Sequence, residues 1–287
     1  MLRVAVPNKG SLHGPAIELL SAAGYRVHRE AKAMFATDAT NDVQFVFLRP
    51  ADIARNVGQG VLDVGITGQD LLAAAGTVDT TTELLALNFG VSWFSFAAPF
   101  GVAASIADLD GKRVATSFSA LVRQAAATAG IHVEHVELDG AVETAVELGL
   151  ADAIADVVET GASLQAAGLH TVGEPIMRSE AVLVRGAHGV LAPSSERAAE
   201  VLIQRLRGVL IARQYVMMEY NCPLAVLDAA RTITPGMESP TVSPLDEEGW
   251  VAVRAMVLRA QAQGVMDRLW AAGARAILVT PLEACRL

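Results

Sequence analysis

The residues best suited to chemistry lie in one run, ADAIADVVETGASL, where an acid-bearing apolar segment meets a turn of small residues. The N–H groups and the dipole of a helix N-terminus bind phosphate oxygens, and Gly161 lets the backbone approach a ligand closely. Thr160 and Ser163 add hydroxyl donors, and Asp156 or Glu159 can accept hydrogen bonds from ribose hydroxyls. The run predicts a sugar-phosphate site. The alternative is an ordinary strand-to-helix turn in which a hydroxyl only caps the helix.

Composition limits the classes of protein to consider. The 287 residues are 52% hydrophobic and 18% charged, which predicts two or three compact domains with substantial cores. A net charge of −9 argues against a nucleic-acid surface. An acidic protein must hold an anionic sugar phosphate through local donors or a metal ion, which points to Mg²⁺.

Neither targeting nor metal chemistry is indicated elsewhere. The chain starts directly with a strand pattern and contains no apolar run long enough to span a bilayer, so we expect a cytoplasmic protein without a membrane partner. Cys222 and Cys285 are far apart and have no histidine nearby, which favours idle thiols over a metal site.

Strand and helix patterns alternate through the first two thirds of the chain, which predicts parallel sheets covered by helices. Expected strands cover residues 2–6, 45–48, 62–66, 93–98, 113–116, 133–138 and the segment that ends at residue 158. Expected helices cover 15–23 and begin at 50, 67–68, 119 and 140. A return strand over 176–184 would join two lobes across a cleft, with Lys9, Thr67 and Thr160 beyond the carboxyl ends of strands.

The last part of the chain follows a different pattern. A helix from residue 194 leads to the order strand, helix, two strands, helix, strand, which is the ferredoxin-like βαββαβ arrangement. We expect a small regulatory domain here, by analogy of fold alone.

Together these motifs resemble the ATP phosphoribosyltransferase family in its long form, and they cover nearly the whole chain in the family's order. The resembling segments are VAVPNKG (4–10), FLRPADI (47–53), DVGITGQD (63–70), the run at 152–164, and PGMESPTVSPL (235–245).

The resemblance implies an α/β fold of two periplasmic-binding-protein-like (type II) lobes plus a C-terminal ferredoxin-like domain. Lobe I would cover 1–90, completed by about 180–210; lobe II would cover 91–179, and the regulatory domain 211–287. It also implies condensation of ATP with phosphoribosyl pyrophosphate to phosphoribosyl-ATP and pyrophosphate, in the first step of histidine biosynthesis. Mg²⁺ would sit on the leaving group. Histidine, AMP and ADP would inhibit, and the oligomer would range from dimer to hexamer.

The resemblance carries over to particular residues. No side chain is assigned as a catalytic acid or base, because positioning and electrostatics should dominate this chemistry. Lys9, Arg49 and Asp156 are expected to position the substrates. The expected substrate-binding residues are Lys9, Gly10, Arg49, Thr67, Gly68, Asp70, Asp156, Glu159, Thr160, Gly161, Ala162, Ser163 and Leu164.

Several of these assignments have simpler alternatives. Lys9 could be a solvated loop lysine, and Arg49 could pair with Asp52 or Asp70 in a structural ion pair. Thr67 and Gly68 resemble a second, weaker anion-binding helix start. Metal ligands are not assigned.

Family resemblance places inhibitory histidine at Asn221, Thr241, Met256 and Ala276. Some relatives carry Asp at the position of Asn221, and the amide lacks the charge that would favour a cationic ligand. We therefore expect histidine inhibition that is present but weaker. A second departure is Phe118-Ser119, where relatives often have Tyr-Pro; Ser119 is expected to cap the following helix. Glu143 could line the cleft or lie on a solvated helix face.

Two rival functions remain open. Two-lobed α/β folds also serve as small-molecule binding or sensor proteins without catalysis, which the expected absence of a signal peptide and of a DNA-binding arm speaks against. A regulatory relative could also keep the fold and lose catalysis, and retention of Lys9, Arg49, Asp156 and Thr160 argues against that.

Overall fold

A computed structural model describes residues 1–28, 33–138, 140–187 and 191–286. The chain divides into two compact units. One comprises Met1–Glu18 with Arg26–Ala199, and the other comprises Leu19–Tyr25 with the chain from Glu200 onward.

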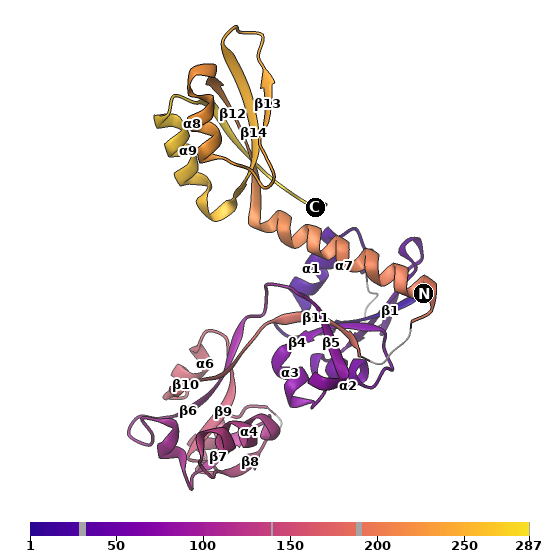
Figure 1. The fold of residues 1–287 in the computed structure, drawn as a ribbon. Helices are drawn as coiled ribbons and strands as arrows, with labels where there is room; N and C mark the ends of the chain where they lie inside the picture. The colour runs from indigo at the N-terminus through magenta and orange to yellow at the C-terminus, as the bar shows by residue number, and fades with distance from the viewer. Residues whose placement is uncertain (29–32, 139, 188–190, 287) are drawn as a thin grey trace. The chain divides into compact units, whose positions relative to one another are not determined.

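The first lobe is built on a six-stranded sheet (Figure 1). Its strands, in spatial order, are β2 (Phe35–Asp38), β3 (Val43–Leu48), β1 (Leu2–Pro7), β4 (Val64–Gly68), β11 (Ala181–Gly186) and β5 (Thr81–Ala86). β1, β3 and β4 are parallel, whereas β2 and β11 run antiparallel to their neighbours. The expected parallel sheet is therefore mixed, because the crossing strand β11 enters from the second lobe.

Two helices, α2 (Pro50–Gly58) and α3 (Gln69–Ala74), pack on this sheet. A further helix, α1 (His13–Ala22), follows β1, and short 3₁₀ turns lie at Ala39–Asn41 and Val78–Thr80. α2 begins with Pro50 at its first turn, as predicted, since proline lacks the N–H that a helix start leaves unpaired. Its buried face (Ile53, Ala54, Val57) packs on the sheet core with Ala5 and Val184. Each large side chain buried there contributes about 1.5–3 kcal/mol.

The second lobe repeats the arrangement. Its strands, in spatial order, are β10 (Leu169–Ser179), β6 (Ser92–Pro99), β9 (Ala153–Val158), β7 (Arg113–Thr116) and β8 (Glu134–Glu137). Its helices are α4 (Ser119–Ala129), α5 (Thr144–Glu147) and α6 (Ala162–Ala166), with a 3₁₀ turn at Ile106–Leu109. Phe94, Phe96 and Val122 lie in its main core. The two sheets share one pattern: β1 lies between β3 and β4 with β11 beyond β4, and β7 lies between β8 and β9 with β6 beyond β9.

An arginine–aspartate pair marks the same place in each lobe. Arg3 in β1 donates its backbone N–H to Asp63 Oδ2 at 2.7 Å, just before β4 begins. Arg113 in β7 does the same to Asp152 at 3.0 Å, just before β9 begins. The strands β4 and β9 therefore start from equivalent positions.

The predicted return strand over 176–184 is two strands. β10 ends at Ser179 in the sheet of lobe II, and β11 begins at Ala181 in the sheet of lobe I, so the chain crosses at Glu180. The polar residues Arg178, Ser179 and Glu180 coincide with the break, but the apolar residues on both sides of them favoured one continuous strand.

Ser119 does not cap its helix as expected. Phe118 occupies the N-cap of α4, with an extended φ of −124°, and Ser119 is the first helical residue. Among the described residues its hydroxyl has no hydrogen-bond partner.

The C-terminal region confirms the ferredoxin-like arrangement. After α7 (Pro193–Gln214), the elements are β12 (Tyr215–Pro223), α8 (Leu227–Ile233), β13 (Thr241–Pro244), β14 (Trp250–Leu258), α9 (Ala262–Ala271) and β15 (Arg275–Pro281). Short 3₁₀ turns at Leu224–Val226 and Arg259–Gln261 precede the two small helices. The sheet order is β13-β14-β12-β15, with antiparallel pairs throughout. Nowhere in the described ranges is a helix long and apolar enough to cross a membrane.

Candidate functional site

The turn between β9 and α6 forms the wall of a cavity of about 360 Å³, here called the lobe II cavity. It is lined by Glu143, Ile154 and every residue from Asp156 to Leu164. The predicted sugar-phosphate residues of this run are therefore brought together around one space.

The start of α6 is shaped for an anion. Gly161 is its N-cap, with φ of 75°, a left-handed conformation that side chains rarely adopt. Thr160 Oγ1 accepts the Ala162 N–H at 3.4 Å. The first turn carries no acid, and its N-cap residue, Gly161, has no side chain to cap it. Ser163 is exposed in this turn. Hydroxyl donors and helix N–H groups thus face the same space without a competing carboxylate from α6.

Asp156 lies on β9 at the edge of the lobe II cavity, opposite Ser95 of β6. Burial raises the pKa of its carboxyl above the ordinary value, and the negative charges of Glu143 and Asp70 raise it further, against a hydrogen bond from the Val157 N–H. In the described part of the chain no Lys or Arg offsets these charges, and an acid held near other acids is typical of a binding site rather than of packing.

A second cavity of about 440 Å³, here called the interlobe cavity, adjoins the first. Lobe I contributes Lys9, Gly10, Ser11, Leu12, Pro50, Gly68, Asp70 and Leu71. The connection from β5 to β6 contributes Gly90, and lobe II contributes Ser92, Val157 and Glu159. Val157 and Glu159 line both cavities. Ser11 Oγ donates a hydrogen bond to Glu159 Oε1 at 2.7 Å, which connects the two lobes across this space.

The equivalent strand-to-helix turn of lobe I is built differently. Thr67 lies inside β4, fully buried, and its hydroxyl donates to the Pro50 carbonyl at 2.9 Å. Gly68 caps α3 in an extended conformation, and Asp70 stands in the first turn of the helix. This helix start already carries the protein's own carboxylate. It therefore lacks the open anion site that the sequence suggested at Thr67 and Gly68.

Asp70 is fixed by Ser179, the last residue of β10. The Ser179 hydroxyl accepts the Asp70 N–H at 3.0 Å and donates to Asp70 Oδ1 at 2.7 Å. Both residues are buried. A Cβ on Gly68 would lie 2.2 Å from Asp70 Oδ1, so glycine is needed there to make room for the carboxylate.

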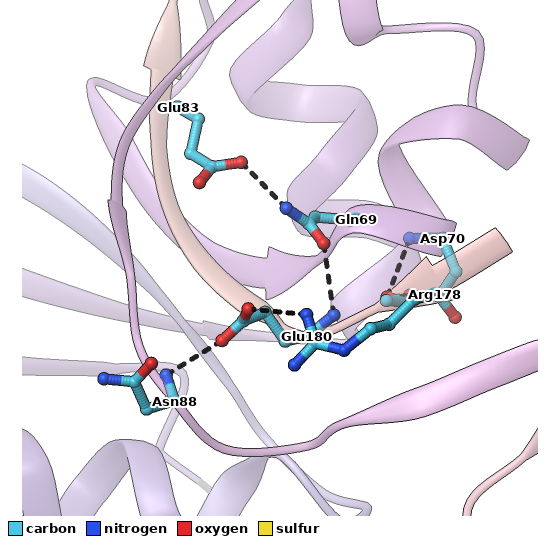
Figure 2. Close-up of polar contacts among 7 residues, drawn as sticks. Gln69, Asp70, Glu83, Asn88, Arg178 and Glu180 are labelled. Atoms are coloured by element: carbon cyan, nitrogen blue, oxygen red, sulfur yellow. Dashed lines mark hydrogen bonds and ion pairs between the residues drawn. The ribbon is translucent and has the colours of Figure 1, made fainter.

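The segment at Glu180, where the chain crosses between the lobes, is hydrogen-bonded to Gln69, the first residue of α3 (Figure 2). Gln69 donates from Nε2 to Glu83 at 3.0 Å and accepts the Glu180 N–H at 3.3 Å. Glu180 accepts from the Asn88 N–H at 3.1 Å and from Arg178 at 3.2 Å. The two connections between the lobes, one between β5 and β6 and the other at Glu180, are thus held beside the start of α3.

The two predicted basic residues lie on lobe I. Lys9 is exposed in the wall of the interlobe cavity. Arg49 is exposed at the N-cap of α2 and lines neither cavity. Within the described ranges it forms no ion pair with Asp52 or Asp70; Arg55 is the partner of Asp52, at 3.5 Å.

The C-terminal domain has its own cavity, of about 310 Å³. Its lining includes three of the four predicted histidine residues, Asn221, Thr241 and Ala276, together with the ion pair of Glu219 and Arg254. Met256 is not among the lining residues, although it follows Arg254 on the same face of β14. Ala276 has φ of 51°, at the point where the pairing of β12 and β15 is irregular.

Sequence reasoning missed Ser11, Ser179 and Glu180, and the only available signal was weak. Each has a hydrogen-bond partner more than 90 residues away, which no local pattern indicates.

Known proteins resemble the chain along its whole length. The family described as ATP phosphoribosyltransferase matches residues 49–208, and the family described as HisG, C-terminal domain, matches residues 212–284. ATP phosphoribosyltransferases of Streptomyces avermitilis and Micrococcus luteus are 54% and 50% identical over 287 residues, with all of both chains covered. The structure of the ATP phosphoribosyl transferase (HisG:HisZ) complex from Thermotoga maritima has a TM-score of 0.61 at 25% identity, over 72% of this chain and 99% of that one.

These matches cover both lobes and the C-terminal domain, and they agree with the fold. The chain belongs to the ATP phosphoribosyltransferase family, and it is a pentosyltransferase that serves histidine biosynthesis.

Proposed function

We propose that the chain condenses ATP with 5-phosphoribosyl 1-pyrophosphate to give N1-(5-phosphoribosyl)-ATP and pyrophosphate. The observation that carries this proposal is the lobe II cavity, where Gly161, two hydroxyls and Asp156 surround one space at a helix start that carries no acid. Purine N1 would displace pyrophosphate from the anomeric carbon.

The sugar phosphate would occupy the lobe II cavity. Its 5′-phosphate would accept hydrogen bonds from the Thr160–Leu164 backbone and from the hydroxyls of Thr160 and Ser163. Asp156 and Glu159 would accept hydrogen bonds from the ribose hydroxyls. Glu159 already accepts a hydrogen bond from Ser11, so binding of the sugar would compete with that interlobe contact.

The nucleotide would occupy the interlobe cavity. Since Val157 and Glu159 line both spaces, N1 and the anomeric carbon would meet where the cavities adjoin. Lys9 would attract the triphosphate or the leaving pyrophosphate, and Arg49 would act at the outer edge. Alignment of the two reactants in adjacent cavities supplies the main catalytic effect, and no side chain needs to abstract a proton.

The acids around the lobe II cavity fit a metal carried by the substrate. No cluster of three or more His, Cys, Asp or Glu able to hold a metal occurs among the described residues. Asp156 and Glu143 nevertheless leave uncompensated negative charge beside the cavity. Mg²⁺ is commonly held by phosphate oxygens, waters and one or two carboxylates, so these two acids are the residues that would complete its shell. When bound there, the ion neutralises the pyrophosphate leaving group.

The test is direct. ATP, phosphoribosyl pyrophosphate and Mg²⁺ are mixed with the protein and pyrophosphatase, and the absorbance of phosphoribosyl-ATP is followed. We expect product to accumulate. Binding of ATP without product formation would instead favour the rival reading, a small-molecule binding or sensor protein.

We further propose that histidine inhibits by binding at Asn221, Thr241 and Ala276, with Met256 at the edge of that cavity. Asn221 supplies an amide where a carboxylate would attract a cation more strongly, so inhibition should be modest. Asn221→Asp should lower the histidine inhibition constant about tenfold, the gain expected when a hydrogen bond becomes charge-assisted. An unchanged constant would contradict this assignment.

AMP and ADP are expected to compete with ATP for the interlobe cavity. The family resemblance supports a homo-oligomer between dimer and hexamer in the cytoplasm, which sedimentation with and without histidine would measure.

A further inference from the structure

The carboxylate of Asp70 is the one buried acid in the wall of the interlobe cavity, with 8% of the residue exposed. We propose that Asp70, positioned by Ser179, accepts a hydrogen bond from the 6-amino group of the purine and thereby selects and activates the nucleotide. This inference rests on the proposed function, and it adds the group that recognises the base.

The shape and chemistry of the cavity suit a purine. Leu12, Pro50 and Leu71 give it apolar surface, and Gly68 and Gly90 offer flat backbone where side chains would otherwise intrude. A planar heterocycle fits between such walls, and a buried acceptor confers specificity for a donor on its edge.

Asp70 is available for such a bond. Ser179 Oγ donates to its Oδ1 at 2.7 Å, which leaves Oδ2 to meet a ligand. Nowhere in the described part of the chain does a Lys, Arg or His form an ion pair with Asp70. A buried carboxylate without a cation is costly unless it has a use, and the N-terminus of α3 offsets only part of that cost.

Ser179 fixes the direction of this carboxylate. It is only 1% exposed, and it contacts both the N–H and the side chain of Asp70. Gly68 leaves the space in which Oδ1 sits. Loss of the Ser179 hydroxyl would leave the carboxylate free to rotate away from the base, so Ser179 is a positioning residue.

The hydrogen bond would strengthen during the reaction. As the N1–C1 bond forms and the C1–O bond to pyrophosphate breaks, pyrophosphate leaves with the electron pair and positive charge passes from the anomeric carbon to the purine. That charge is shared with the 6-amino group, whose protons stay on nitrogen. A carboxylate at this group is therefore attracted more strongly in the transition state than in the ground state, which raises kcat.

The experiment compares ATP with purine riboside 5′-triphosphate, which keeps N1 and lacks the amino group. kcat and KM are measured for both nucleotides with the unchanged protein, Ser179→Ala, Ser179→Thr and Asp70→Asn. Ser195→Ala serves as a matched control, because Ser195 is a buried serine of α7 that lines neither cavity. Thermal denaturation checks that each variant folds.

The unchanged protein should prefer ATP in kcat by about tenfold or more, the scale of one charged hydrogen bond. Ser179→Ala should reduce that preference by about fivefold and Asp70→Asn should nearly abolish it, mainly through kcat with ATP. Ser179→Thr should restore the preference, and Ser195→Ala should leave it unchanged.

Two failures can be told apart. Absence of phosphoribosyl-ATP with the unchanged protein would overturn the proposed function itself. If ATP reacts normally but Ser179→Ala and Asp70→Asn lower both nucleotides equally, Asp70 has only a structural role and this inference is wrong.

Discussion

The two lobes place a helix after the same strand, but only one of these helix starts is open to an anion. From Asp63 to the N-cap Gly68 the chain of lobe I takes five residues, whereas from Asp152 to the N-cap Gly161 lobe II takes nine. The longer connection of lobe II carries Asp156, Glu159 and Thr160. In lobe I, the shorter connection leaves Thr67 buried within the strand.

The second difference concerns charge. Asp70 and Ser163 each stand two residues after the glycine N-cap of a helix. Asp70 places a carboxylate at the positive end of α3, while Ser163 leaves α6 with a neutral hydroxyl. A helix dipole favours one anion near its N-terminus. Under the proposed function, the same fold element would hold an acceptor for the base in lobe I and receive a phosphate in lobe II.

Ser163→Asp should have the largest effect, because it gives lobe II the helix start of lobe I. The new carboxylate would repel the 5′-phosphate and compete for the N–H groups of α6. We expect kcat/KM for phosphoribosyl pyrophosphate to fall by about 100-fold or more, from two lost hydrogen bonds of charged groups. Steady-state kinetics measures it, and Ser163→Ala, expected to lose only a few-fold, is the control. Equal losses in both variants would contradict the charge argument.

Asp156→Asn should lower kcat/KM for phosphoribosyl pyrophosphate by about 10- to 100-fold, since the ribose hydroxyls lose a charged acceptor.

Asp156→Asn should not destabilise the fold at neutral pH. Burial, Glu143 and Asp70 raise the pKa of Asp156 above 3.8, so the folded state binds more protons than the unfolded state just above that pH. The protonated Asp156 carboxyl therefore contributes to the free energy of unfolding of the unchanged protein. This contribution should be lost as the pH rises from 3.8 through the raised pKa.

Thermal denaturation of both proteins from pH 4 to pH 8 tests this. Relative to the unchanged protein, Asp156→Asn should gain stability as the pH increases. A variant that becomes relatively less stable on going to neutral pH would refute the stated sign.

The two N-cap glycines should respond differently to alanine. Gly68→Ala puts a Cβ where Asp70 Oδ1 lies, so it should raise KM or lower kcat for ATP about tenfold with little effect on the sugar donor. Gly161→Ala meets no close atom, but it must hold φ of 75°, which costs about 1–2 kcal/mol. Gly161→Ala should therefore change KM or kcat for the sugar donor rather than for ATP. Kinetics with each substrate varied in turn decides this, and a loss confined to the same substrate in both variants would contradict the division between the lobes.

The smallest effect is expected at the arginine–aspartate pairs at the starts of β4 and β9. Hydrogen bonds from the Arg113 side chain and backbone lower the pKa of Asp152 below 3.8. The pair is more than one-third exposed, so Asp152→Asn should cost only about 0.5–1 kcal/mol. Because the pKa is lowered, that loss should be present above pH 3.8 and vanish as the pH falls through the folded-state pKa. Urea denaturation at pH 7 and pH 3 measures it, with Asp63→Asn as the lobe I counterpart; a loss that grows in acid would oppose this account.

The sequence predicted the elements well where composition and periodicity act locally. Pro50 at a helix start, the strand at 113–116 and the turn at Thr160–Gly161 all depend on neighbouring residues. Pairings between distant segments could not be predicted from the sequence. Thr67 has the same Thr-Gly signature as Thr160, yet Thr67 is buried because its strand runs on to Gly68.

Ser179 and Asp70 illustrate the same limit. They are 109 residues apart, and nothing in either local pattern indicates their hydrogen bonds. The symmetry of the lobes was also hidden. Asp-Val and Thr-Gly recur with the same spacing at 63–68 and 156–161, but the pairing of Arg113 shows that Asp152, rather than Asp156, is the counterpart of Asp63.

The division of labour between the lobes is tested most directly by equilibrium binding to Ser163→Asp. Calorimetric titration with Mg²⁺ present would measure the dissociation constants of phosphoribosyl pyrophosphate and of ATP for this variant and for the unchanged protein. We predict that affinity for phosphoribosyl pyrophosphate falls by about 100-fold while affinity for ATP stays within a factor of about three. Unchanged binding of the sugar donor, or an equal loss for both ligands, would contradict the account.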